Sequence, residues 1–138
     1  MIKYPSLELN WLPKAKDVPL PNMFVVDDYD YSGCYYNPEY AEVELDGKCV
    51  SIENGLIIIK SNTSPSTIAH EFRHHLQWWY GMDLGAVAWD FHKPYKDAIV
   101  EYYTKSLTEL DALLYECEHY PDDDNMQNYE WVCRGLQL

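Results

Sequence analysis

The sequence lacks any long run of apolar residues. No stretch approaches the roughly eighteen apolar residues that a membrane-spanning helix needs. The N-terminal residues, M-I-K-Y-P-S-L-E-L-N, contain no apolar segment of the length found in a signal peptide. Internal repeats, linkers and low-complexity segments are also missing. We therefore expect a soluble, cytoplasmic protein without a membrane partner, in which residues 1–138 form a single domain.

Basic residues are scarce. The chain has 10 lysines and arginines against 23 aspartates and glutamates, which gives a formal net charge of −13. An acidic surface repels phosphate backbones, so nucleic-acid binding is not expected. With 47% hydrophobic residues, the composition is that of a globular protein rather than of a disordered one.

Paired cysteine motifs are absent as well. The chain has four cysteines, Cys34, Cys49, Cys117 and Cys133, and no two of them form a C-x-x-C pair. In a chain that is not expected to be secreted, scattered cysteines of this kind are reduced and partly buried. We therefore predict free thiols.

Turn signals divide the first part of the chain. Residues 1–40 are rich in proline and tyrosine, and we predict them to be irregular apart from one short strand near residues 23–26. Residues 41–60 have the pattern of a β-meander, in which D-G and N-G turns join three strands. The predicted strands are 41–45, 48–52 and 56–60, and the last of them, L-I-I-I-K, is rich in β-branched residues.

A motif helix is predicted over residues 64–80. Ser64 suits the N-cap, Pro65 suits the first helical position, and Gly81 suits the end of the helix. Apolar residues recur at steps of three and four, which gives the helix one apolar stripe: Ile68, Phe72, Leu76 and Trp79. The helix is therefore expected to pack on a sheet or on another helix.

A second helical region is predicted over residues 95–119. Ser106 and Thr108 each precede an acidic residue by three positions, which is the capping-box pattern, and a helix restart is expected at Thr108. Apolar residues of the acidic tail are expected to dock on the core as a terminal helix: Trp131, Val132 and Leu136. These elements predict an α+β fold with an antiparallel or mixed sheet of three to four strands packed on the motif helix.

The motif helix contains H-E-F-R-H, which fits the pattern H-E-x-x-H. Residues four apart lie on one face of a helix, so His70 and His74 can present two imidazole nitrogens to one metal ion. Glu71 can reach a water on that ion without binding the metal. Two histidines and one carboxylate are a standard catalytic zinc set. We predict that Zn²⁺ binds here and that Glu71 is the general base, the alternative being a solvated helix face with bystander histidines.

A third ligand is indicated by a resemblance. H-E-x-x-H followed by a downstream E-x-x-A, here E-L-D-A in the second helical region, is similar to the gluzincin zinc metallopeptidases and to their small single-domain forms, the minigluzincins. The resemblance covers residues 56–116. It implies a zincin-like domain with a second ligand-bearing helix, and it implies that Glu109, the first residue of E-L-D-A, is the third zinc ligand.

The chain departs from that family at one position. Gluzincins often have an aspartate four residues after the ligand glutamate to orient a histidine, and Leu113 occupies that position here. Glu116 lies on the same helical face as Glu109 and is our candidate for this supporting role. Asp111 and Glu116 also remain alternatives to Glu109 as the third ligand. Arg73 is assigned to a surface or sheet contact.

The predicted function is zinc-dependent hydrolysis of a peptide bond. The resemblance implies that a peptide substrate pairs with an edge strand before the motif helix, which assigns this role to residues 56–60. Two other functions stay open: a catalytically inactive binding or structural protein with a metallopeptidase-like scaffold, and a metal hydrolase that acts on a different bond. Several side chains are candidates to stabilise an oxyanion, namely His92, Tyr95, Tyr102, Tyr103 and Tyr115.

Overall fold

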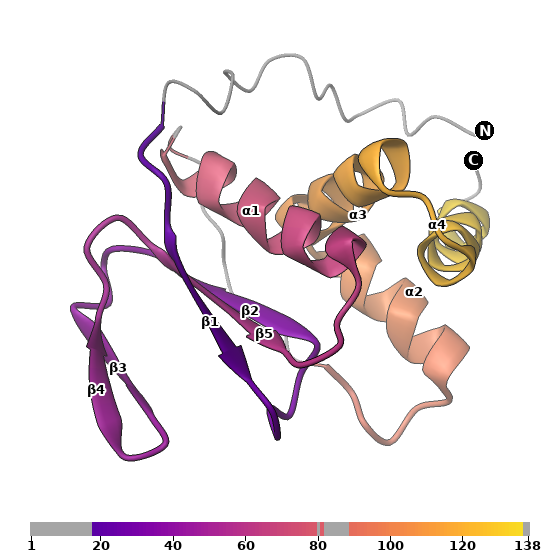
Figure 1. Ribbon diagram of the computed structural model, residues 1–138. Coiled ribbons are helices and arrows are strands. Elements are labelled where there is room, and N and C mark those ends of the chain that lie inside the picture. The colour runs from indigo at the N-terminus through magenta and orange to yellow at the C-terminus, as the bar shows by residue number, and fades with distance from the viewer. Residues whose placement is uncertain (1–17, 80, 82–88, 137–138) are drawn as a thin grey trace.

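The computed structural model describes residues 18–79, 81 and 89–136 (Figure 1). Within these residues the strands come first, and they are β1 (Asn22–Val26), β2 (Gly33–Tyr36), β3 (Glu42–Leu45), β4 (Lys48–Ser51) and β5 (Leu56–Lys60). The helices follow as α1 (Pro65–Trp79), α2 (Tyr95–Lys105), α3 (Leu107–His119) and α4 (Asp123–Gly135). The prediction of an α+β fold is confirmed for this part of the chain.

The strand β5 is the central strand of a three-stranded mixed sheet with the order β1-β5-β2. It runs parallel to β1 and antiparallel to β2, so that Met23 and Tyr35 both lie opposite Ile57. The first four residues of β5, L-I-I-I, are all buried. An apolar run that is buried on both faces suits the middle of a sheet, which explains the central place of this strand.

The strands β3 and β4 form a separate two-stranded sheet, in which Val43 lies opposite Val50. The predicted D-G hairpin turn is confirmed, since Asp46 and Gly47 have positive φ angles of 50° and 77°. The predicted β-meander is wrong, because β5 pairs with β1 and β2 instead of β4. The strand β2 was not predicted, and it lies in the segment that was expected to be irregular.

The central place of β5 corrects one functional expectation. Residues 56–60 were expected to be an edge strand that binds a peptide, but both edges of this strand are already paired. Its backbone hydrogen-bonding groups are therefore used within the sheet, and a peptide cannot add to it. The edge strands of the described sheet are β1 and β2.

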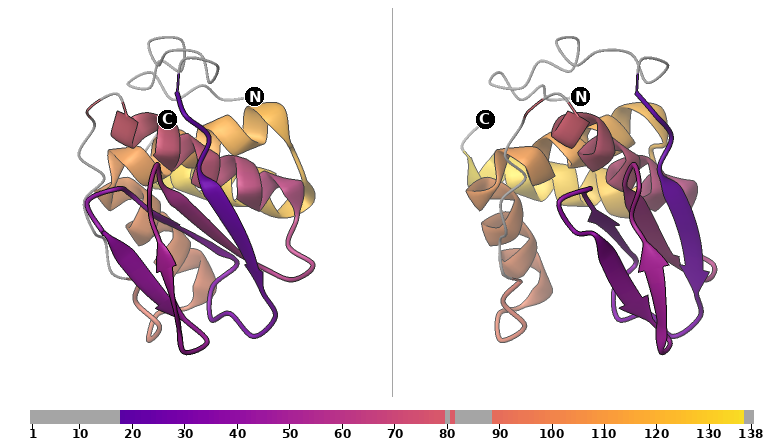
Figure 2. Two further views of the ribbon diagram at one scale, coloured as in Figure 1. Left: turned by 60° about the vertical axis from the view of Figure 1, so that its left-hand side comes forward. Right: turned by 90° about the vertical axis from the view of Figure 1, so that its left-hand side faces the viewer.

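The helices gather on one side of the molecule and the strands on the other (Figure 2). Helix α1 packs on the three-stranded sheet, and α3 packs along α1. Helix α4 packs against α2 and α3. The helical core includes Ile99, Leu113 and Val132, and a smaller cluster contains Ile52 with Leu56 and Ile58 of β5. The predicted terminal helix is confirmed as α4. None of the helices in the described ranges has both the length and the apolar character needed to cross a bilayer.

A break at Ser106 separates α2 from α3. The backbone of Ser106 is extended, with φ −133° and ψ 112°, and its hydroxyl accepts a hydrogen bond from the backbone N–H of Glu109 at 3.2 Å. The helix restart therefore lies at Ser106 rather than at the predicted Thr108. The motif helix agrees with its prediction from Pro65 to Trp79, and residue 80 lies outside the described residues.

Candidate metal centre

The helix α1 brings its polar motif residues to one place. His70 and His74 are one turn apart, and their ring centroids are separated by 4.9 Å. One ligand atom from each of His70, Glu71 and His74 lies within 4.8 Å of the others, which is close enough for a single metal ion. All three side chains are largely removed from solvent.

Glu109 reaches the same place from α3. Its Oε2 lies 2.9 Å from Nε2 of His70, and its Oε1 lies 3.1 Å from Nε2 of His74. The capped start of α3 at Ser106 puts Glu109 in the first helical turn, where α3 packs along α1. The structure thus brings Glu109, the predicted third ligand, together with both histidines.

The other ring nitrogen of each histidine is held by a side-chain oxygen. Nδ1 of His70 is 2.8 Å from Oε1 of Glu116, and Nδ1 of His74 is 2.8 Å from Oε1 of Gln77. Glu116 therefore lies where a supporting residue was expected, seven positions after Glu109 on the same face of α3. Gln77 was not foreseen. These contacts orient both rings so that their Nε2 atoms face Glu109.

Asp111 lies away from the centre and faces Arg73. Oδ2 of Asp111 accepts a hydrogen bond from Nε of Arg73 at 2.8 Å, and Oδ1 accepts one from the Nη2 atom at 3.1 Å. The alternative of Asp111 as the third ligand is therefore wrong for this arrangement, because both of its oxygens are engaged. The assignment of Arg73 to a surface or sheet contact is also wrong, since only 3% of the residue is exposed and it joins α1 to α3.

The charges of the centre act strongly on one another. Burial alone would lower the pKa of His70, but hydrogen bonds with Glu109 and Glu116 outweigh it and raise that pKa well above its ordinary value. Burial alone would raise the pKa of Glu109, but the two histidines hold it well below its usual range. For Glu71, burial raises the pKa, and the opposing effect of the histidines is smaller. The centre thus concentrates carboxylate charge around two imidazole rings.

Two buried polar atoms of the centre have no hydrogen-bond partner, and they are Oε2 of Glu71 and Nε2 of His74. Nε2 of His74 approaches Glu109 to 3.1 Å, but without the direction of a hydrogen bond. Leaving a buried polar atom without a partner costs about 1–3 kcal/mol, so such atoms are rare. A cation between His70, His74 and Glu109 would give Nε2 of His74 the partner that it lacks.

The donor set also fits zinc in chemistry and spacing. Imidazole nitrogen and carboxylate oxygen are both zinc ligands, and two ligands of one tetrahedral zinc ion lie about 3.4 Å apart. The observed separations between the two Nε2 atoms and the carboxylate of Glu109 are 2.9 and 3.1 Å. Small side-chain movements would therefore admit the ion.

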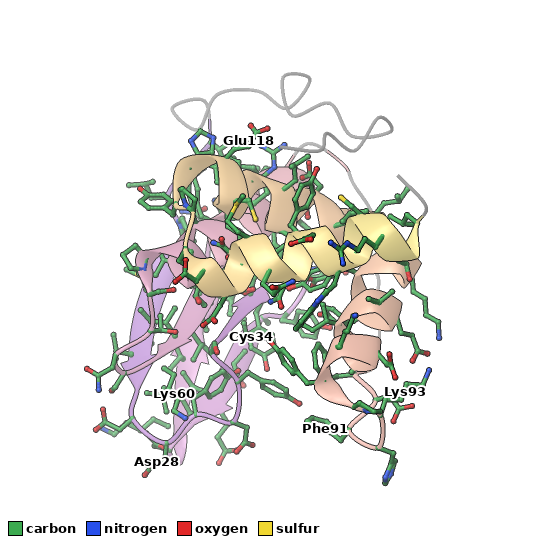
Figure 3. The ribbon with its side chains drawn as sticks, turned by 90° about the vertical axis from the view of Figure 1, so that its right-hand side faces the viewer. Asp28, Cys34, Lys60, Phe91, Lys93 and Glu118 are labelled. Carbon is green, nitrogen blue, oxygen red and sulfur yellow. The ribbon has the colours of Figure 1, made fainter. Side chains whose placement is uncertain are left out.

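The edge strand β2 lies beside the centre. A Cβ at Gly33 would be 2.9 Å from Cγ2 of Thr67 and 3.1 Å from Cγ of Glu71, so glycine permits this close approach of β2 to α1. Cys34 is the next residue on the strand (labelled in Figure 3), and burial together with the charge of Glu71 raises the pKa of its thiol. No pattern in the sequence had pointed to either residue.

Two of the oxyanion candidates lie near the centre. The ring centroid of Tyr103 is 6.3 Å from that of His70, and burial together with nearby carboxylates raises the pKa of Tyr102 well above its ordinary value. Tyr115 instead lies beneath Arg73, whose guanidinium carbon is 4.9 Å from the centroid of the tyrosine ring. The remaining two candidates, His92 and Tyr95, are exposed.

No protein-family model, curated protein or solved structure matches this chain. Its function must therefore be inferred from the chemistry of the candidate centre itself.

Proposed function

We propose that the chain is a zinc-dependent peptidase of the gluzincin type, in which His70, His74 and Glu109 hold the metal and Glu71 is the general base. The convergence of two imidazole nitrogens on one carboxylate, at 2.9 and 3.1 Å, carries this proposal. A cluster that served only to stabilise the fold would not be expected to leave an oxygen of Glu71 buried without a partner.

A bound zinc ion would lower the pKa of a water molecule and polarise the carbonyl to be attacked. The residues of the chain have separate tasks in this chemistry. Oε2 of Glu71, which is free of other hydrogen bonds, accepts the proton of the attacking water. The raised pKa of this carboxyl, caused chiefly by burial, makes Glu71 a better base and lets it pass the proton to the leaving amine. Glu116 and Gln77 keep the histidine rings in place.

The substrate is proposed to be an extended peptide that pairs with β2. This strand is next to Glu71 and, within the described sheet, pairs only with β5. An extended segment could therefore form main-chain hydrogen bonds along its open edge. With a net charge of −13, the protein favours basic substrate segments over acidic ones.

The test combines metal analysis with a peptide library. The wild-type chain should contain zinc and cleave members of the library. Glu71→Gln should retain the zinc and lose about 10²- to 10⁴-fold in rate, because the proton acceptor is removed while the ligands stay. Glu118→Gln is the matched control, since it makes the same chemical change at an exposed position of α3 and should cleave like the wild type.

Two outcomes would refute the proposal. A zinc-loaded wild type that cleaves no peptide would favour the catalytically inactive scaffold. Equal cleavage by wild type and Glu71→Gln would remove Glu71 from the reaction.

A further inference from the structure

The side-chain amide of Gln77 can adopt only one orientation. Its Nε2 donates one hydrogen bond to the backbone carbonyl of Thr108 at 2.9 Å and another to Oδ2 of Asp111 at 2.6 Å. Both amide hydrogens are then used, and Oε1 points at Nδ1 of His74. A flipped amide would set its oxygen against two acceptors, so this orientation follows from the neighbours of Gln77.

The orientation of Gln77 in turn fixes the tautomer of His74. An amide oxygen can only accept a hydrogen bond, so Nδ1 of His74 must carry the hydrogen of the 2.8 Å contact. In the neutral ring, Nε2 then keeps its lone pair, and this is the atom that faces Glu109 without a hydrogen bond. The neutral ring of His74 therefore offers Nε2, and not Nδ1, to a metal ion.

The acceptor that fixes Gln77 is itself held by Arg73. Asp111 is 1% exposed, and its two contacts with the guanidinium of Arg73 are 2.8 and 3.1 Å long. In these contacts both oxygens of Asp111 act as hydrogen-bond acceptors, and Oδ2 also accepts from Gln77. Arg73 and Gln77 are four residues apart on α1 and both contact this single carboxylate of α3.

We infer that Gln77 is a positioning residue through which the Arg73–Asp111 ion pair sets the tautomer and ring orientation of His74. His70 differs, since the carboxylate of Glu116 holds its Nδ1 directly. The consequence for metal affinity rests on the proposed zinc site. The tautomer of His74 does not, because it follows from hydrogen bonds that are already present.

The first experiment reads the tautomer in the metal-free protein. Long-range ¹H–¹⁵N spectra distinguish Nδ1–H from Nε2–H imidazole, and they are recorded at a pH at which the same spectra show the His74 ring to be neutral. The wild type should show Nδ1–H. Gln77→Met, which keeps the size of the side chain but has no oxygen acceptor, should shift the population toward Nε2–H. A wild-type ring with Nε2–H would overturn the inference.

The second experiment measures the dissociation constant of Zn²⁺ by competition with a chromogenic chelator. Gln77→Met should weaken zinc binding by about 10- to 100-fold, the usual effect of losing a residue that supports a ligand. Asp111→Asn should also weaken binding in the wild-type background. In the Gln77→Met background, Asp111→Asn should change zinc affinity by less than about twofold, because Asp111 acts on His74 through Gln77, which is already replaced.

A control variant distinguishes an effect on the orientation of His74 from a general loss of protein stability. Leu113→Ala changes a buried side chain of α3 in the helical core, and it should lower thermal stability while leaving zinc affinity unchanged. Equal effects of Asp111→Asn in both backgrounds would overturn the inference. An Nδ1–H tautomer in a wild type that binds no zinc would support the positioning of His74 and refute the proposed function.

Discussion

Removing either partner of the Arg73–Asp111 ion pair should cost the folded protein about 3–5 kcal/mol. The magnitude follows from burial, since Arg73 is 3% exposed and Asp111 is 1% exposed. After Asp111→Leu, the guanidinium would lose both of its contacts with the carboxylate and keep the ring of Tyr115, whose centroid lies 4.9 Å from its central carbon. For 138 residues the unfolding entropy is about 0.3 kcal/mol per kelvin, so the melting temperature should fall by about 10–17 °C.

The assay is urea denaturation of the metal-free protein, with a double variant and an exposed control. Arg73→Met and Asp111→Leu should each show the full loss, whereas the double variant should recover the part that comes from the unpaired charge. It should keep a loss of about 1–3 kcal/mol, because a buried N–H of Gln77 still lacks its acceptor. Arg134→Met breaks an ion pair whose side chains are 68% and 45% exposed, and it should cost less than about 1 kcal/mol. A loss below about 1 kcal/mol at either buried residue would refute the reasoning.

Three further predictions concern metal, core and backbone. Zinc at about 100 times its dissociation constant should stabilise the chain by about 2.7 kcal/mol, or about 9 °C in a thermal melt, and a chelator should reverse the shift. Ile58→Ala, at a residue with no exposure, should cost about 2–5 kcal/mol in urea denaturation, whereas Val25→Ala at the exposed edge strand should cost little. Gly55→Ala should lower the melting temperature more than Gly47→Ala. At Gly55, φ is +128° and a new Cβ would lie 2.6 Å from Oη of Tyr35, whereas a Cβ at Gly47 would meet no atom within 4 Å.

The sequence was most informative where a feature depends on near neighbours in the chain. Ser64, Pro65 and Gly81 are local signals, and they predicted the limits of α1. The convergence of His70 and His74 needed only the helical repeat. The D-G turn likewise predicted the β3–β4 hairpin because two positive φ angles are a local requirement.

Features that depend on contacts between residues far apart in the chain could not be predicted. The run L-I-I-I indicated burial but could not show that β5 pairs with β1 and β2, since pairing is decided between segments far apart in the chain. The strand β2, G-C-Y-Y, was missed because all four residues are half-buried and no alternation marks them. Arg73 was misplaced for a related reason, because only the packing of α3 on α1 brings Asp111 to it.

The most direct test of the central claim is elemental analysis of the purified chain beside Glu109→Ala and its matched control, Glu118→Ala at an exposed position of the same helix. Wild type and Glu118→Ala should each contain about one zinc ion per chain, and Glu109→Ala should lose most of it, because His70 and His74 alone make an incomplete set. A wild type without a divalent metal, or a Glu109→Ala chain that keeps its full zinc content, would contradict the proposed centre.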